Sequence, residues 1–116
     1  MRKEKKIILR FRAANKDFFI AIKKGEKRVE TRAATAKYRN MNAGDVVEFV
    51  CGAARFRRTV RRAKIFKNIS TLLKKHDVTD IVPQANSSKE LAAMYASFPA
   101  YREKIKKFGI IALEFA

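Results

Sequence analysis

The chain has very few of the residues from which disulfides, metal sites and redox centres are built. Its 116 residues include one cysteine, Cys51, and one histidine, His76. One cysteine cannot form an internal disulfide, and one cysteine with one histidine is too few for a zinc site. We therefore expect no cofactor, no metal and a reducing compartment, with Cys51 filling space at the end of a strand.

Long apolar runs are also missing. No stretch approaches the length that a membrane-spanning helix needs, so we expect no membrane association. Residues 1–9 are basic and then apolar, like the start of a signal peptide, but Arg10 and Arg12 interrupt the apolar part too early. These features predict a cytoplasmic protein.

Acidic residues are scarce relative to basic ones. The chain has 28 Lys and Arg against 11 Asp and Glu, and its formal net charge is +17. Such an excess suits a polyanionic partner, and nucleic acid fits better than a membrane surface because the basic residues are spread over predicted strands and loops. The alternative is that the charge serves only solubility and self-repulsion.

The apolar pattern predicts one α+β domain over residues 1–116. Alternation predicts strands at 6–12, 46–51, 55–66 and 110–115, with a bulge near residues 61–62. Helices are expected at 15–24 behind an Asn15 cap, around 69–73, at 87–98 behind a Ser87 or Ser88 cap, and at 101–108. Residues 32–41 and 78–86 are expected to be irregular. The residues expected to be buried together are Phe11, Val29, Val47, Phe49, Val60, Ile111 and Leu113.

The most informative stretch is residues 25–32, with the sequence GEKRVETR. Gly25 can end the preceding helix, and the residues after it have the composition of a strand. In a strand from Gly25 onward, Lys27 would lie on the face opposite to Glu30 and Arg32. Glu30 and Arg32 would then pair, or hold a polar ligand together. The plain alternative is a capped helix followed by an edge strand with solvated charges.

The pattern G-x-K-x-x-E-x-R, placed after a strand and a helix, resembles the signature of the ASCH domain, a member of the PUA-like superfamily. Gly44-Asp45 followed by the apolar run 46–50 resembles the turn and barrel strand of that family, and residues 66–73, 92–98 and 109–115 resemble its later elements. The resemblance spans nearly the whole chain. It implies a small, open PUA-like β-barrel with flanking helices and a role in RNA-linked processes.

The resemblance further implies an RNA-binding cleft lined by Lys27, Glu30 and Arg32. The two cations would hold phosphate or a base acceptor, and Glu30 would accept a hydrogen bond from an exocyclic amine. The basic strand 55–64 would supply contacts to the RNA backbone. Tyr95 is a candidate for base stacking and equally for the core. The remaining candidates are Tyr38, Arg39, Arg55, Arg57, Arg58 and Arg61.

Two other functions remain open at this point. Some small proteins of this family are amidohydrolases that act on N4-acetylcytidine, and others have been described as ribonucleases. The resemblance makes Lys27 and Glu30 the catalytic candidates. The amidohydrolase pattern, however, has a hydroxyl residue where this chain has Glu30, together with a distant glutamate, for which residues 77–87 offer only Asp77 and Asp80. The third possibility is a domain whose basic surface binds an acidic protein.

Overall fold

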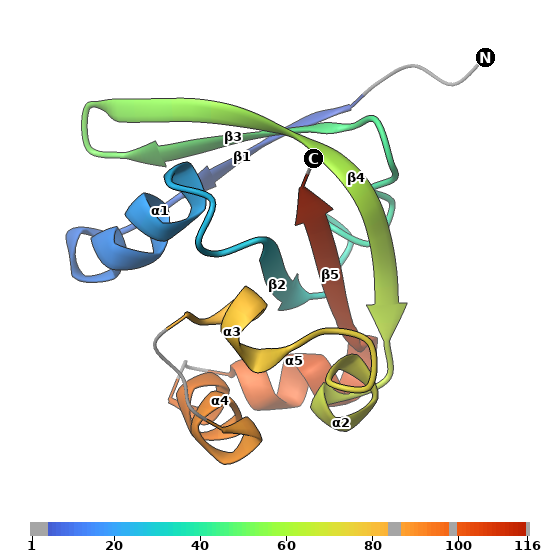
Figure 1. Ribbon diagram of the computed structural model, residues 1–116. Helices are drawn as coiled ribbons and strands as arrows, with labels where there is room; N and C mark the ends of the chain where they lie inside the picture. The colour runs from blue at the N-terminus through green and yellow to red at the C-terminus, as the bar shows by residue number, and fades with distance from the viewer. Residues whose placement is uncertain (1–4, 84–86, 98–99, 116) are drawn as a thin grey trace.

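The computed structural model describes residues 5–83, 87–97 and 100–115, which form a curled five-stranded sheet with helices against it (Figure 1). The strand order is β1-β3-β4-β5-β2, with β1 parallel to β3 and the other neighbours antiparallel. The strands are β1 (Lys6–Arg10), β2 (Val29–Ala33), β3 (Val46–Cys51), β4 (Ala54–Phe66) and β5 (Ile110–Phe115). This half-barrel confirms the predicted α+β, barrel-like architecture.

The 13-residue strand β4 joins the two halves of the sheet. Its residues 54–59 pair with β3, and its residues 60–66 pair with β5. The register shifts between Val60 and Arg62, where the bulge was predicted. A bulge bends the strand that carries it and increases the local twist, so β4 can leave one half of the sheet and enter the other (Figure 1).

Two apolar clusters fill the interior, and side chains of β5 reach both. The barrel cluster contains Ile111 and Leu113 of β5, and the helical cluster contains Ile110 and Ala112. The remaining buried members of the barrel cluster are Leu9, Phe19, Ile22, Ala34, Met41, Val47, Phe49 and Val60. The helical cluster is completed by Val29, Ala33, Phe66, Leu72, Ile81, Val82, Leu91, Tyr95 and Ile105.

The prediction of one shared core was therefore wrong for two residues. Val29 belongs to the helical cluster, because it lies opposite Glu114 of β5 and so shares the face of Ala112. Phe11 is only partly buried and packs on the barrel cluster just beyond the end of β1. The strand predicted for residues 6–12 ends at Arg10.

The helices lie at two ends of the sheet (Figure 1). The 3-10 turn η1 (Ala13–Asn15) and helix α1 (Lys16–Lys23) follow β1. The other helices gather at the far end: α2 (Ile69–Leu72), α3 (Val78–Ile81), α4 (Ser88–Ala96) and α5 (Tyr101–Phe108). In the part of the chain that the structure describes, no helix is long and apolar enough to cross a membrane.

The helix ends follow the predicted signals in part. Ser87, a predicted cap, accepts a hydrogen bond from the backbone N–H of Glu90, and Asn68 accepts one from that of Thr71 at the start of α2. Asn15 occupies the cap position of α1, but within the described residues its side chain makes no capping bond. Residues 78–86, predicted to be irregular, contain α3. Phe98, the last residue of the helix predicted at 87–98, lies outside the described residues.

Candidate functional site

The motif 25–32 begins where α1 ends. Gly25 has a φ of +81°, as expected for a residue that terminates a helix, and the next two backbone N–H groups both donate to the carbonyl of Ala21. Strand β2 starts only at Val29. The predicted alternation from Gly25 onward is therefore wrong. Lys27 precedes the strand, and its Nζ lies 3.7 Å from Oε1 of Glu30.

Side chains of the motif cover the free edge of β2. Because β2 is the last strand of the sheet, one row of its backbone groups has no strand partner. Nζ of Lys27 donates to the carbonyl of Val29 at 2.8 Å, and the N–H of Thr31 donates to Oε1 of Glu30 at 3.0 Å. The hydroxyl of Tyr101 accepts from the N–H of Ala33 at 2.9 Å and donates to the carbonyl of Thr31 at 3.4 Å. The edge strand is thus closed by side chains.

Lys27 also ties β2 to α3, because its Nζ donates to the carbonyl of Ile81. Two carbonyls accept hydrogen bonds from the ammonium group, and the Glu30 carboxylate forms an ion pair with it at 3.7 Å. Lys27 is only 4% exposed, and burial lowers its pKa, an effect that the nearby Glu30 carboxylate partly offsets. Its contacts are those of a residue that positions β2 and α3.

A pocket of about 400 Å³ opens beside this edge, and Arg32 is its most accessible motif residue. The Arg32 side chain is 27% exposed, and its Nη2 lies 3.8 Å from Oε2 of Glu30. Its guanidinium lies 5.7 Å from the centre of the Phe11 ring. Lys27, Glu30 and Arg32, the three predicted cleft residues, therefore line one pocket. The other lining residues are Arg10, Phe11, Arg12, Asn15, Phe18, Thr31, Ile81, Val82, Met94, Tyr95 and Tyr101.

Two stacked tyrosines form the aromatic part of this pocket. The rings of Tyr95 and Tyr101 lie 5.6 Å apart with an angle of 3° between their planes. The hydroxyls of Tyr95 and Thr31 form a hydrogen bond. Tyr95 is 4% exposed, so it is a core residue and also lines the pocket. Burial raises the pKa of both tyrosines above the ordinary value of 10.0, so their hydroxyls stay protonated and can donate hydrogen bonds well into the alkaline range.

The loop residues Tyr38 and Arg39 do not line this pocket. Tyr38 is partly buried against the barrel cluster. Arg39 donates to the carbonyl of Ala34 at 2.8 Å. Both were predicted as nucleic-acid contacts, and for both that stays a prediction.

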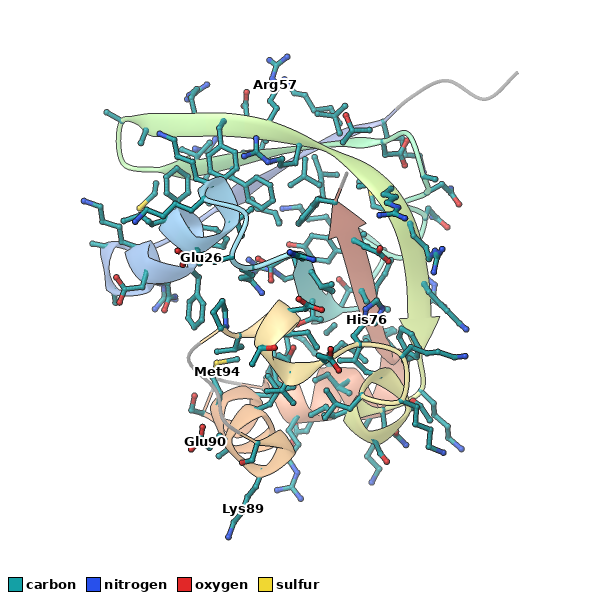
Figure 2. The ribbon with its side chains drawn as sticks, viewed as in Figure 1. Glu26, Arg57, His76, Lys89, Glu90 and Met94 are labelled. Carbon is teal, nitrogen blue, oxygen red and sulfur yellow. The ribbon has the colours of Figure 1, made fainter. Side chains whose placement is uncertain are left out.

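The predicted arginines of β4 also lie elsewhere, on surfaces away from the motif pocket. Arg55 and Arg57 both pair with Glu48, at 3.7 and 3.1 Å, and Arg57 points outward from the strand (Figure 2). Arg58 lies on the other face, 4.9 Å from the centre of the Phe56 ring. Arg61 reaches Glu114 at 3.9 Å.

Among the pocket residues that sequence reasoning missed are Arg10, Arg12 and Tyr101. A signal for Arg10 and Arg12 was available, because alternation along residues 6–12 puts both on the face opposite to Leu9 and Phe11. Tyr101 carried none, because the first residue of a short helix can point in several directions. Its position depends on how α5 packs against β2.

The fold and the motif geometry can be compared with known proteins. The model of the ASCH domain family matches residues 14–116. The chain belongs to the ASCH domain family. No curated protein matches it.

Solved structures share the fold of this ASCH domain. The crystal structure of the hypothetical protein PH0355 superposes with a TM-score of 0.80 at 24% identity, covering 95% of this chain and 96% of that one. The solution NMR structure of protein PF0455 from Pyrococcus furiosus gives a TM-score of 0.70 at 26% identity, covering 97% and 96%.

The motif pocket of this ASCH domain offers arginine side chains, aromatic rings and one carboxylate. Glu30 is the only carboxylate that lines the pocket among the residues described. Asp80, a candidate for a second catalytic acid, lines a different cavity, and Asp77 lines neither of the two. Across the described residues, no three His, Cys, Asp or Glu side chains form a group that could hold a metal ion.

Proposed function

We propose that this ASCH domain binds RNA and that the motif pocket receives one nucleotide of a single strand. The observation that carries the proposal is the composition of the pocket: three arginines and a stacked tyrosine pair around one carboxylate. Guanidinium groups suit phosphates and base acceptors, while unstacked bases of single-stranded RNA suit aromatic and guanidinium planes.

Within the pocket, Arg32 is the residue that meets the ligand. Its 3.8 Å separation from Glu30 is longer than a hydrogen bond, so its N–H donors are available to phosphate or to a base oxygen. Glu30 can accept from an exocyclic amine through Oε2, because its Oε1 already accepts from the N–H of Thr31. The role of Lys27 changes from the predicted ligand contact to positioning β2 and Glu30.

The net charge of +17 supplies the second argument, because it favours any polyanion and steers its approach. Arg10 and Arg12 are exposed residues that line the same pocket, so part of this charge lies at the proposed site. RNA is favoured over an acidic protein because the pocket also offers an aromatic pair and an acceptor, which a purely ionic contact would not use.

The arrangement favours binding over hydrolysis. Nζ of Lys27 is buried, donates to two backbone carbonyls and lies in an ion pair with Glu30 at 3.7 Å, so this amine is poorly placed to attack a substrate or accept a proton. Hydrolysis in this pocket would also need a second acid–base group, and Glu30 is the only carboxylate lining the pocket among the described residues. Mass spectrometry of N4-acetylcytidine and of a labelled RNA incubated with the protein tests this choice, and turnover would contradict it.

The binding test is fluorescence anisotropy with a single-stranded RNA of about ten nucleotides at several salt concentrations. If about 4–6 phosphates are neutralised, the logarithm of the association constant should fall with the logarithm of salt with a slope of roughly −3 to −4. Salt-independent binding, or no binding at low salt, would contradict the proposal.

A further inference from the structure

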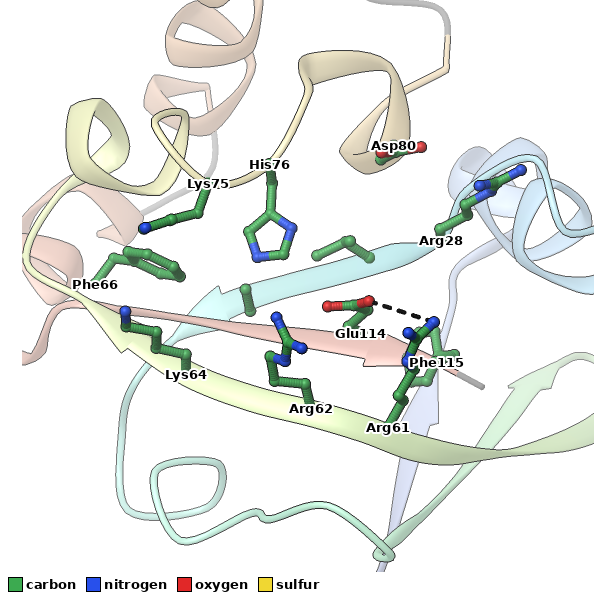
Figure 3. A pocket seen from close by; sticks show the side chains of 12 residues that line it. Arg28, Arg61, Arg62, Lys64, Phe66, Lys75, His76, Asp80, Glu114 and Phe115 are labelled. Carbon is green, nitrogen blue, oxygen red and sulfur yellow. Dashed lines mark ion pairs between the residues drawn. The ribbon is translucent and has the colours of Figure 1, made fainter.

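A second cavity, of about 480 Å³, is lined by residues of β2, β4 and β5 and carries an excess of positive charge (Figure 3). Its walls come from β4 and β5 on one side and from α3 and the chain after α2 on the other. It is lined by Arg28, Val29, Arg61, Arg62, Lys64, Phe66, Lys75, His76, Asp80, Ala112, Glu114 and Phe115. We refer to it as the basic pocket.

Four cations of the basic pocket have no ion-pair partner among the residues described. These are Arg28, Arg62, Lys64 and Lys75, which have no carboxylate of that part of the chain within 4.0 Å, whereas Arg61 is paired with Glu114 at 3.9 Å. Arg62 and Lys64 rise from β4 on one side of the pocket, and Lys75 lies on the other side (Figure 3). Unpaired cations around a concavity attract an anion, because the field of each adds to that of the others.

The interior of the basic pocket combines the apolar phenyl ring of Phe66 with the polar imidazole of His76. Phe66 is 6% exposed, and the centre of its ring lies 5.8 Å from that of His76 in an edge-to-face arrangement. Nζ of Lys64 lies 5.3 Å from the centre of the same ring. The imidazole, which points into the pocket in Figure 3, adds a hydrogen-bond donor to the surrounding cations. Such a surface suits the oxygens of a phosphate group beside apolar parts of the same ligand.

Neighbouring residues of β2 and α3 line the basic pocket and the motif pocket. Val29 lines the first, and Glu30, Thr31 and Arg32 line the second. The residue before β2 contacts α3, because the N–H of Arg28 donates to the carbonyl of Asp80 at 2.9 Å. Three steps along β2 span about 10 Å, so a strand bound in one pocket reaches the other within a few nucleotides. The exposed Arg28, which lines the basic pocket, lies at this contact between the start of β2 and α3.

We propose that the basic pocket is a second subsite that binds backbone phosphates of the RNA strand whose nucleotide occupies the motif pocket. This inference rests on the proposed RNA binding and adds a direction to it: the strand crosses the junction of β2 and α3. Phosphates could also come from a free nucleotide, which shares the same anionic chemistry. The experiment therefore includes both sources.

The test compares the double variant Arg62→Gln/Lys64→Gln with the control Arg102→Gln/Lys104→Gln. Both variants remove two positive charges, and the control residues are exposed on α5 and line neither pocket. Anisotropy is measured with RNAs of about ten and about three nucleotides, and ATP binding is measured separately by calorimetry. Melting curves of both variants should match the wild type, because Arg62 and Lys64 are exposed and form no ion pair within the described residues.

We expect the Arg62/Lys64 variant to bind the longer RNA about tenfold more weakly than the control does, with a salt slope shallower by about 1.4, the value for two phosphates on a single strand. Binding of the short RNA should equal that of the control. Equal binding of the longer RNA by both variants would overturn the second subsite. A loss confined to ATP would overturn it in favour of a free nucleotide.

The same measurements test the proposed RNA binding independently of the second subsite. If the wild type binds the longer RNA and Arg32→Gln weakens that binding, RNA binding at the motif pocket stands whatever the double variant shows. If the wild type binds no RNA, the proposed function is wrong, and the second subsite is overturned with it.

Discussion

Lys27→Met is the substitution that most directly tests how the motif holds the fold together. Methionine keeps the length of the apolar stem and removes the ammonium. The carbonyls of Val29 and Ile81 lose a buried donor, and Glu30 loses one neighbouring cation. A buried acceptor that loses its donor costs about 1–3 kcal/mol of stability. The variant also no longer buries a charge, and this offsets part of the loss. We therefore expect the free energy of unfolding to fall by about 3 kcal/mol. For a chain of 116 residues this lowers the melting temperature by about 12 °C.

The assay is urea unfolding followed by far-UV circular dichroism, because the chain has no tryptophan. The control, Lys104→Met, makes the same chemical change at an exposed position of α5 and should cost no more than about 0.5 kcal/mol. If Lys27→Met cost as little as the control, Lys27 would not be buried between β2 and α3 in solution.

The pH dependence of this cost follows from the lowered pKa of Lys27. Between that pKa and the ordinary value of 10.5, the unfolded chain binds more protons at this residue than the folded chain does. The stability of the wild type therefore contains a contribution that rises with pH in this range, and the variant lacks it. The cost of Lys27→Met should grow as the pH is raised toward 10.5. A cost that shrinks with rising pH would contradict the reasoning.

Two further predictions concern the backbone and the tyrosines. Gly109→Ala should cost about 2–3 kcal/mol more than Gly25→Ala in urea unfolding. Both glycines have positive φ, but a Cβ at Gly109 would lie 2.7 Å from the carbonyl oxygen of Phe66, whereas one at Gly25 would meet none of the described residues within 4 Å. Equal costs would refute the close approach at Gly109. Burial raises the pKa of Tyr95 and Tyr101, so the stability that their protonated hydroxyls contribute is present below pH 10.0 and is lost above it. Tyr95→Phe removes the part of this loss that comes from Tyr95. The pH at which the variant unfolds in alkali should therefore be higher than its stability at neutral pH would suggest, and an unchanged midpoint pH would show that the Tyr95 hydroxyl is accessible.

Local patterns predicted much of the fold. The helix ends at Gly25 and Gly109 follow from the freedom of glycine at positive φ, and the Ser87 cap follows from its hydroxyl. The bulge beyond Val60 was visible because the apolar residues of β4 change parity there. Each of these signals lies within a few residues of the feature that it predicts.

The errors arose where distant contacts decide the outcome. The start of β2 depends on the backbone bond between Arg28 and Asp80, more than 50 positions apart in the sequence, so Lys27 could not be assigned to a face from its neighbours. The division into two apolar clusters depends on β5, whose two faces are both covered. The convergence of Lys27, Glu30 and Arg32 was predicted from the family resemblance. The covering of the strand edge by Tyr101 was not, because nothing local directs α5 toward β2.

The central claim is that the motif pocket binds RNA through Arg32, and the affinity of Arg32→Gln tests it most directly. The measurement is the anisotropy of a single-stranded RNA at low salt, beside the wild type and Arg102→Gln, which removes the same charge from an exposed position of α5. We predict that Arg32→Gln weakens binding by about 1–3 kcal/mol while Arg102→Gln changes it far less. Equal affinities for Arg32→Gln and Arg102→Gln would contradict the account.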